Sequence, residues 1–293
     1  MSPRALVCWV WVALASGPVS ASAGAWTREP GGFFASVAYQ RISAESFYGP
    51  DFSKIPIRPY TQQSVSAYAE LGVVQRWLTL MFDGQLYRRN SLDGQGFTDG
   101  LSDTRLGAWT GLVVTPVRLS FGLLLGLPTG DSAPKAGPGA DRDAQHIAAT
   151  LPTGDGEVDV ELRLSLGHAF GGAKAGWPLA HYLQVDAGYW LRTAGFADAF
   201  TWAFELGTKF PWGFAERFWL IAKVFGVESF ASSTEAAATF SGLGNGLTFT
   251  AFGVQLHGRI HGGLGAAVQV DGALRARGVA AGANLRFSLT YER

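Results

Sequence analysis

Cysteine, net charge and long apolar runs are all scarce in this 293-residue chain. The single cysteine, Cys8, lies in the first ten residues, so no disulfide can form within the chain. Twenty-three basic and 23 acidic residues give a formal charge of zero, and no basic tract indicates nucleic-acid binding. Charged residues make up only 16%, which is low for a soluble protein. Beyond the N-terminus no apolar run approaches the ~20 residues of a membrane helix.

The N-terminal residues have the pattern of an export signal. Arg4 supplies a positive charge, 5–15 is apolar but too short to span a bilayer, and Ala21-Ser22-Ala23 fits a cleavage site. The sequence therefore predicts a signal peptide at 1–23 and a mature domain at 24–293 without cysteine. The alternative is a short N-terminal membrane anchor.

The rest of the chain alternates between apolar and polar residues with a period of two. The segment 157–166 places Glu157, Asp159 and Glu161 on one face and aliphatic residues on the other. This period predicts a β-strand, because in a helix the aliphatic residues would spread around the cylinder. We expect twelve such strands, near 31–42, 62–74, 77–90, 102–114, 117–127, 157–170, 178–193, 200–210, 217–230, 247–260, 264–277 and 284–291.

Long and short connections alternate between these strands, as in an outer-membrane hairpin barrel with short periplasmic turns and long external loops. The expected strands, of about 11 to 16 residues, are long enough to cross a bilayer when tilted. Tryptophans near the short turns would form an aromatic girdle at Trp77, Trp177, Trp212 and Trp219. The fold class predicted is an all-β, antiparallel, up-and-down transmembrane β-barrel of about twelve strands, located in the outer membrane of a Gram-negative-type bacterium. A soluble secreted β-protein, with its apolar faces packed together, is the alternative.

Two nearly identical segments flank the longest connection. Leu127-Pro128-Thr129-Gly130-Asp131 and Leu151-Pro152-Thr153-Gly154-Asp155, with the strand that follows the second, resemble the MetA-pathway of phenol degradation family of outer-membrane proteins over 126–170. The resemblance implies an outer-membrane barrel that passes small aromatic or other apolar molecules. Many such barrels end in an aromatic residue recognised by the barrel-assembly machinery, and Tyr291 is the candidate here.

Charged side chains on the polar face would line the lumen. The candidates of both signs are Glu70, Asp83, Arg89, Arg105, Arg118, Glu157, Asp159, Glu161, Arg163, Asp186, Arg192, Glu205, Lys209, Lys223, His257, Arg259, Asp271, Arg275 and Arg286. They would either border a hydrated pathway or pair with one another in a filled barrel. The acidic ladder of Glu157, Asp159 and Glu161 would favour cations unless neighbouring arginines neutralise it.

A ligand or metal site at the mouth is a weaker hypothesis. The mouth-loop motif comprises Thr129, Gly130, Asp131, Thr153, Gly154 and Asp155. Such residues form turns more often than binding sites. His146 with Asp141 and Asp143 is a second metal candidate, but the expected result is no metal and no cofactor. Ser165 and His168 are three apart on a strand and cannot cooperate in catalysis, so the sequence predicts no enzyme.

Two functions remain open at this stage. The first is a porin-like passive channel or transporter for small molecules, and the second is a plugged structural or enzymatic barrel. The expected partners are outer-membrane lipid, a small solute and the assembly machinery, with no nucleic acid. The sequence does not fix the solute, the state of the lumen or the oligomeric state.

Overall fold

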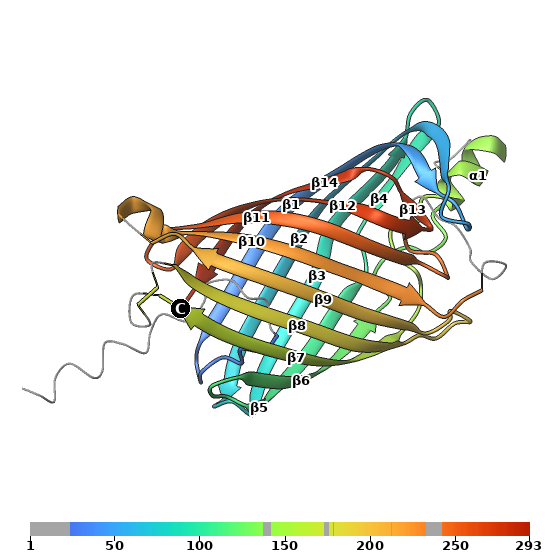
Figure 1. Cartoon of the computed structure of the whole chain (residues 1–293). Helices are drawn as coiled ribbons and strands as arrows, with labels where there is room; N and C mark the ends of the chain where they lie inside the picture. Colours follow the sequence, from blue (N-terminus) through green and yellow to red (C-terminus); the bar gives the residue numbers. More distant parts are fainter. Residues whose placement is uncertain (1–23, 137–141, 173–175, 178, 212, 233–241) are drawn as a thin grey trace, which may run out of the picture.

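The computed structural model describes residues 24–136, 142–172, 176–177, 179–211, 213–232 and 242–293. Within them, twelve antiparallel strands form a closed ring, which β1 completes by pairing with both β2 and β14 (Figure 1). The ring strands are β1 (Phe33–Tyr48), β2 (Lys54–Val74), β3 (Leu78–Leu92), β5 (Thr104–Val113), β6 (Arg118–Leu127), β7 (Asp159–Gly171), β8 (Ala180–Leu191), β9 (Ala199–Lys209), β10 (Phe218–Ser229), β11 (Thr248–His261), β12 (Leu264–Arg277) and β14 (Ala283–Glu292). The predicted fold class and strand number are confirmed.

Among the described residues, two short strands and two short helices lie outside the ring. They are β4 (Gly96–Gly100), β13 (Val279–Ala280), α1 (Arg142–Ala149) and the 3₁₀ helix η2 (Gly213–Arg217). No helix among the described residues is both long and apolar enough to cross a membrane.

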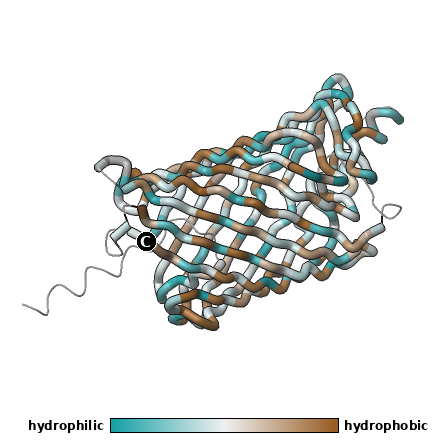
Figure 2. Tube along the Cα trace, in the orientation of Figure 1, coloured by the Kyte–Doolittle hydropathy of each residue, from teal (hydrophilic) through white to brown (hydrophobic). Residues whose placement is uncertain are grey.

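The outer surface of the barrel is apolar. Val37 is 54% exposed, Leu164 49% and Leu289 67%, although each lies within a paired strand. Figure 2 shows hydrophobic and hydrophilic residues alternating along the strands. A soluble sandwich would bury these faces against each other, whereas lipid covers them in a membrane barrel. Closure also leaves no free sheet edge, which a bilayer requires.

The predicted tryptophan girdle is only partly correct. Trp77 and Trp177 are exposed near short turns, 53% and 54%, as a girdle requires. Trp219 instead faces inward, is 8% exposed and packs with Tyr182 and Ile221. Trp212 lies outside the described residues.

Two predicted loops are largely strand. The connection between the strands expected at 31–42 and 62–74 shrinks to 49–53, because β1 extends to Tyr48 and β2 begins at Lys54. Its prolines, Pro56 and Pro59, precede Tyr60, where the pairing of β2 with β3 begins, and a free edge tolerates proline. The loop predicted after residue 92 contains β4, which folds back on β3.

A β-bulge reverses the predicted orientation of Arg89. The β2–β3 pairing shifts between Val65 and Ser66, and a shift of one residue moves side chains to the opposite face. Arg88 therefore points inward, where it donates hydrogen bonds to Gln62 and Asn90. The Arg89 guanidinium lies 3.8 Å from the centre of the Phe97 ring instead, so Arg89 does not line the lumen.

The two ends of the barrel differ. One end carries the short turns and the described chain termini, and the other carries α1, β4 and β13 (Figure 1). We refer to them as the turn end and the loop end.

Candidate functional site: the barrel interior

The segment 24–32 crosses the interior at the turn end, an arrangement that the sequence analysis missed. Its first part contacts β6, β7 and β8: Ser120 Oγ donates to Gly24 O at 2.5 Å, and Trp26 packs edge-on against Tyr182 with ring centres 5.7 Å apart. Its last part reaches β2, where the backbones of Gly32 and Gly72 pair at 2.9 Å. In the ring order β8 lies nearly opposite β2.

Arg28 fixes this segment to the barrel wall. Its guanidinium lies 2.6 Å from Glu70 Oε2 on β2 and 2.5 Å from Glu292 Oε1 on β14, while its backbone N–H donates to Thr79 Oγ1 at 2.9 Å. Glu70 is fully buried, so its charge depends on this partner. Glu70, predicted to line the lumen, therefore anchors the N-terminal segment. A local sequence pattern gave no sign of this, since the partners are 42 and 264 residues away.

At the loop end the two Thr-Gly-Asp segments pack directly on each other. Asp131 O accepts the N–H groups of Thr153 at 2.9 Å and Gly154 at 3.1 Å, and Asp131 N–H donates to Thr153 Oγ1 at 3.0 Å. A Cβ added to Gly130 would lie 2.6 Å from Gly154 Cα, so only glycine permits the contact. The mouth-loop motif thus joins the two ends of the long connection, which is a structural role.

Asp103, between β4 and β5, holds both segments. Its carboxylate accepts the N–H groups of Gly130 at 3.0 Å and Asp155 at 2.7 Å. Burial raises the pKa of Asp103 to about 6, with the nearby Asp155 carboxyl adding to the effect. The sequence analysis missed Asp103, which falls at the start of the strand expected at 102–114 and was not among the lumen candidates.

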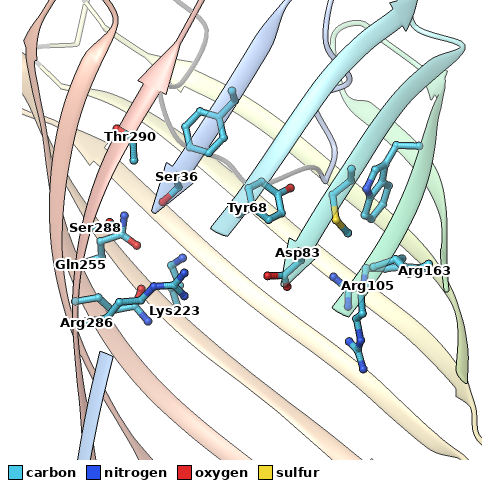
Figure 3. A pocket seen from close by; sticks show the side chains of 15 residues that line it. Ser36, Tyr68, Asp83, Arg105, Arg163, Lys223, Gln255, Arg286, Ser288 and Thr290 are labelled. Carbon is cyan, nitrogen blue, oxygen red and sulfur yellow. The ribbon is translucent and has the colours of Figure 1, made fainter. Parts of the chain in front are cut away.

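Between these two ends the interior holds two neighbouring cavities of about 290 and 470 Å³. Both are lined by Arg105, Arg163, Lys223, Gln269 and Arg286. In Figure 3, Arg286, Lys223 and Gln255 lie on one side of the smaller cavity, and Asp83, Arg105 and Arg163 lie on the other. A third cavity of about 230 Å³ extends past Arg105 to Asp103 and Asp155. The three cavities share Arg105 in their lining, and the third reaches the mouth-loop motif at Asp155.

Arginines neutralise the acidic ladder. Glu161 has no exposed side-chain surface and lies 2.7 Å from Arg163 and 3.5 Å from Arg105. Glu157 lies just before β7 and pairs with Arg192, and Asp159 lies 3.9 Å from Arg105. The ladder is therefore part of an ion-pair network, and neighbouring arginines neutralise the acidic side chains that would otherwise favour cations.

The remaining candidates divide by position. Asp186 and Glu205 line the larger cavity, where Glu205 pairs with Lys223 at 2.9 Å. His257 is fully buried beside Thr290, and Asp271 accepts a hydrogen bond from Gln269 at 2.8 Å. Four cations lie near strand ends, outside the residues that line these cavities: Arg118, Lys209, Arg259 and Arg275.

The second metal candidate finds no support in the described part of the chain. Asp143 and His146 lie exposed on α1, and Asp141 falls outside the described residues. No group of three or more potential ligands among the described residues could hold a metal ion.

These features define the class of the protein: a transmembrane β-barrel of the outer-membrane type, with an apolar outer face and a polar interior. No family model matches the sequence, and no curated protein matches it. The fold is similar to that of an outer membrane channel from Pseudomonas putida F1, at TM-score 0.62 and 16% identity over 94% of this chain and 100% of that one. It is also similar to the β domain of the Bordetella autotransporter Brka, at TM-score 0.50 and 13% identity over 90% and 100%. At these identities the comparisons support the fold.

Proposed function

We propose that the protein is a narrow passive channel for small molecules in the outer membrane. The observation that carries the proposal is the set of three cavities in the interior, all bordered by Arg105 and other charged residues. Asp83 lies midway along β3 inside the barrel and is nevertheless solvent-exposed. A barrel filled by a paired network alone would leave no such accessible charge at its middle.

Membership of the MetA-pathway of phenol degradation family is part of this proposal. The two Leu-Pro-Thr-Gly-Asp segments carry the resemblance. Their direct packing on each other gives the repeated motif a structural role. The similarity of fold to the Pseudomonas putida channel spans that whole chain and is consistent with membership.

The N-terminal segment is the expected restriction of the channel. It crosses the interior at the turn end and is held there by two ion pairs of Arg28. Arg28→Gln removes both pairs, so we expect larger or more frequent conductance steps in planar bilayers than for the wild-type protein. Arg58→Gln is the matched control, because it removes one positive charge from an exposed residue at the loop end.

The alternative is a plugged barrel with a structural or enzymatic role. Ser165, for example, donates a hydrogen bond to Asp186, while His168 contacts Pro116 O, so the two do not form a catalytic pair. If correctly folded wild-type and Arg28→Gln proteins both fail to conduct, the channel proposal is wrong and this alternative stands.

A further inference from the structure

The lining of the larger cavity combines apolar side chains with the four cations Arg105, Arg163, Lys223 and Arg286. We refer to its apolar part as the apolar wall, which consists of Trp190, Phe225, Val227, Leu247 and Phe249. Phe225 and Phe249 meet edge to face with ring centres 6.0 Å apart, which is a favourable aromatic arrangement. A ligand that fits this space combines an apolar body with a charged group.

The cations differ in how well they are neutralised. Lys223 lies 2.9 Å from Glu205, and Arg163 lies 2.7 Å from Glu161. Arg286 has no carboxylate within 4.0 Å among the described residues, and it donates a hydrogen bond to the neutral Ser66 Oγ at 3.4 Å. A guanidinium inside a barrel is attracted more strongly to an anion than one in bulk water, because the effective dielectric constant is lower. Arg286 is therefore the open anion-binding group of the cavity.

The lining carboxylates argue against a cationic ligand. Glu205 is paired with Lys223, and Asp186 accepts hydrogen bonds from Ser165 and from Gln184. Asp83 does not border the larger cavity. It lines the smaller one, on the side opposite Arg286 (Figure 3).

We propose that this cavity binds small organic monocarboxylates with an apolar body. We also propose that these compounds are the solutes of the channel, and this second assignment rests on the proposed function. The carboxylate forms a bidentate pair with Arg286. The planar guanidinium suits this geometry better than other cationic side chains do. The apolar body lies against Phe225 and Phe249. The volume of about 470 Å³ is ample, since a cavity of about 150 Å³ already holds benzene.

Calorimetric titration of the refolded full-length protein with three probes tests this site. Benzoate carries both features, acetate carries only the charge, and benzyl alcohol carries only the ring. We expect benzoate to bind at least tenfold more tightly than either of the others. Arg286→Gln should weaken benzoate binding about tenfold, and Phe249→Ala should reduce the preference for benzoate over acetate. Arg259→Gln, exposed near the end of β11, removes a charge outside the cavity lining and should leave binding unchanged.

The outcomes separate the site from the channel. Equal binding of the three probes, or benzoate binding that Arg286→Gln leaves intact in a folded protein, overturns the proposed site. Binding that depends on Arg286 in a protein without bilayer conductance supports the site and refutes the channel. Conductance that benzoate reduces in the wild-type protein but not in Arg286→Gln supports both. Phe249→Ala, which keeps every charge, tests the apolar wall independently if Arg286→Gln does not fold.

Discussion

At the scale of single residues, the Gly130–Gly154 contact tightly constrains the loop end. A Cβ on Gly154 would lie 2.4 Å from Asp103 Oδ1 and 2.7 Å from Gly130 Cα. The wall of this contact is partly backbone, so it cannot move aside as a flexible side chain would. Both repeated segments therefore need glycine at this position.

Gly154→Ala should destabilise the protein by about 1–3 kcal/mol, the usual cost of overpacking. Urea unfolding followed by heat-modifiable gel mobility would measure the change. Gly272→Ala is the control, because a Cβ there has no heavy atom within 4 Å. Equal unfolding midpoints for both variants would contradict the packing role of Gly154.

Asp103 gives the loop end a pH dependence. Its pKa is raised to about 6, so the folded state favours the protonated form. The resulting stabilisation is fully present below the unfolded-state pKa of about 4 and is lost as the pH rises through about 6. We expect slower amide exchange at Gly130 and Asp155 at pH 4.5 than at pH 7.5, after correction for intrinsic exchange rates. Asp103→Asn, which cannot titrate, should abolish this difference, and its persistence would assign the effect to another group.

At the scale of the strand, β7 shows why the two faces are not interchangeable. Leu164 is 49% exposed on the outer face, while the adjacent Arg163 points into the cavities. The strand thus separates hydrocarbon from a polar interior by one residue. The same contrast between lipid outside and a polar interior explains the alternation of apolar and polar residues in every strand of the ring.

Leu164→Arg should cost about 2–4 kcal/mol if the residue lies near the bilayer midplane. Ala203→Arg places the same side chain at the cavity wall, where water and carboxylates are available, and should cost much less. Folding yields in lipid vesicles at increasing urea concentrations compare the two. A larger loss for Ala203→Arg would mean that the assigned faces are reversed.

At the scale of the whole molecule, the barrel should be oriented with the loop end outside the cell. Short turns face the periplasm in bacterial outer-membrane barrels. Single cysteines at Ser53 and Ala133, both exposed at the loop end, should react with a membrane-impermeant maleimide in intact cells. A cysteine at Gln75, in the turn between β2 and β3, should react only after lysis. Labelling of Gln75→Cys alone in intact cells would reverse the topology.

The sequence by itself determined the number of strands, the alternation of apolar and polar residues along them, and which face of each strand is apolar. These properties are local: lipid on one side of a strand and a polar interior on the other impose a period of two on any single segment, such as 157–166. The sequence could not show where that period slips. The bulge opposite Val65 and Ser66 moved Arg88 inward and Arg89 outward without any change in composition.

Only the tertiary structure decided which interior charges are neutralised and what occupies the lumen. Glu70 and Glu292 are far apart in the chain, yet ring closure places both beside Arg28. Glu161 and Arg286 resembled each other as polar-face charges in the sequence. The neighbouring strands give Glu161 two arginines and leave Arg286 without a carboxylate among the described residues. Such differences arise from strand register and closure, which bring distant residues together, and no local pattern encodes them.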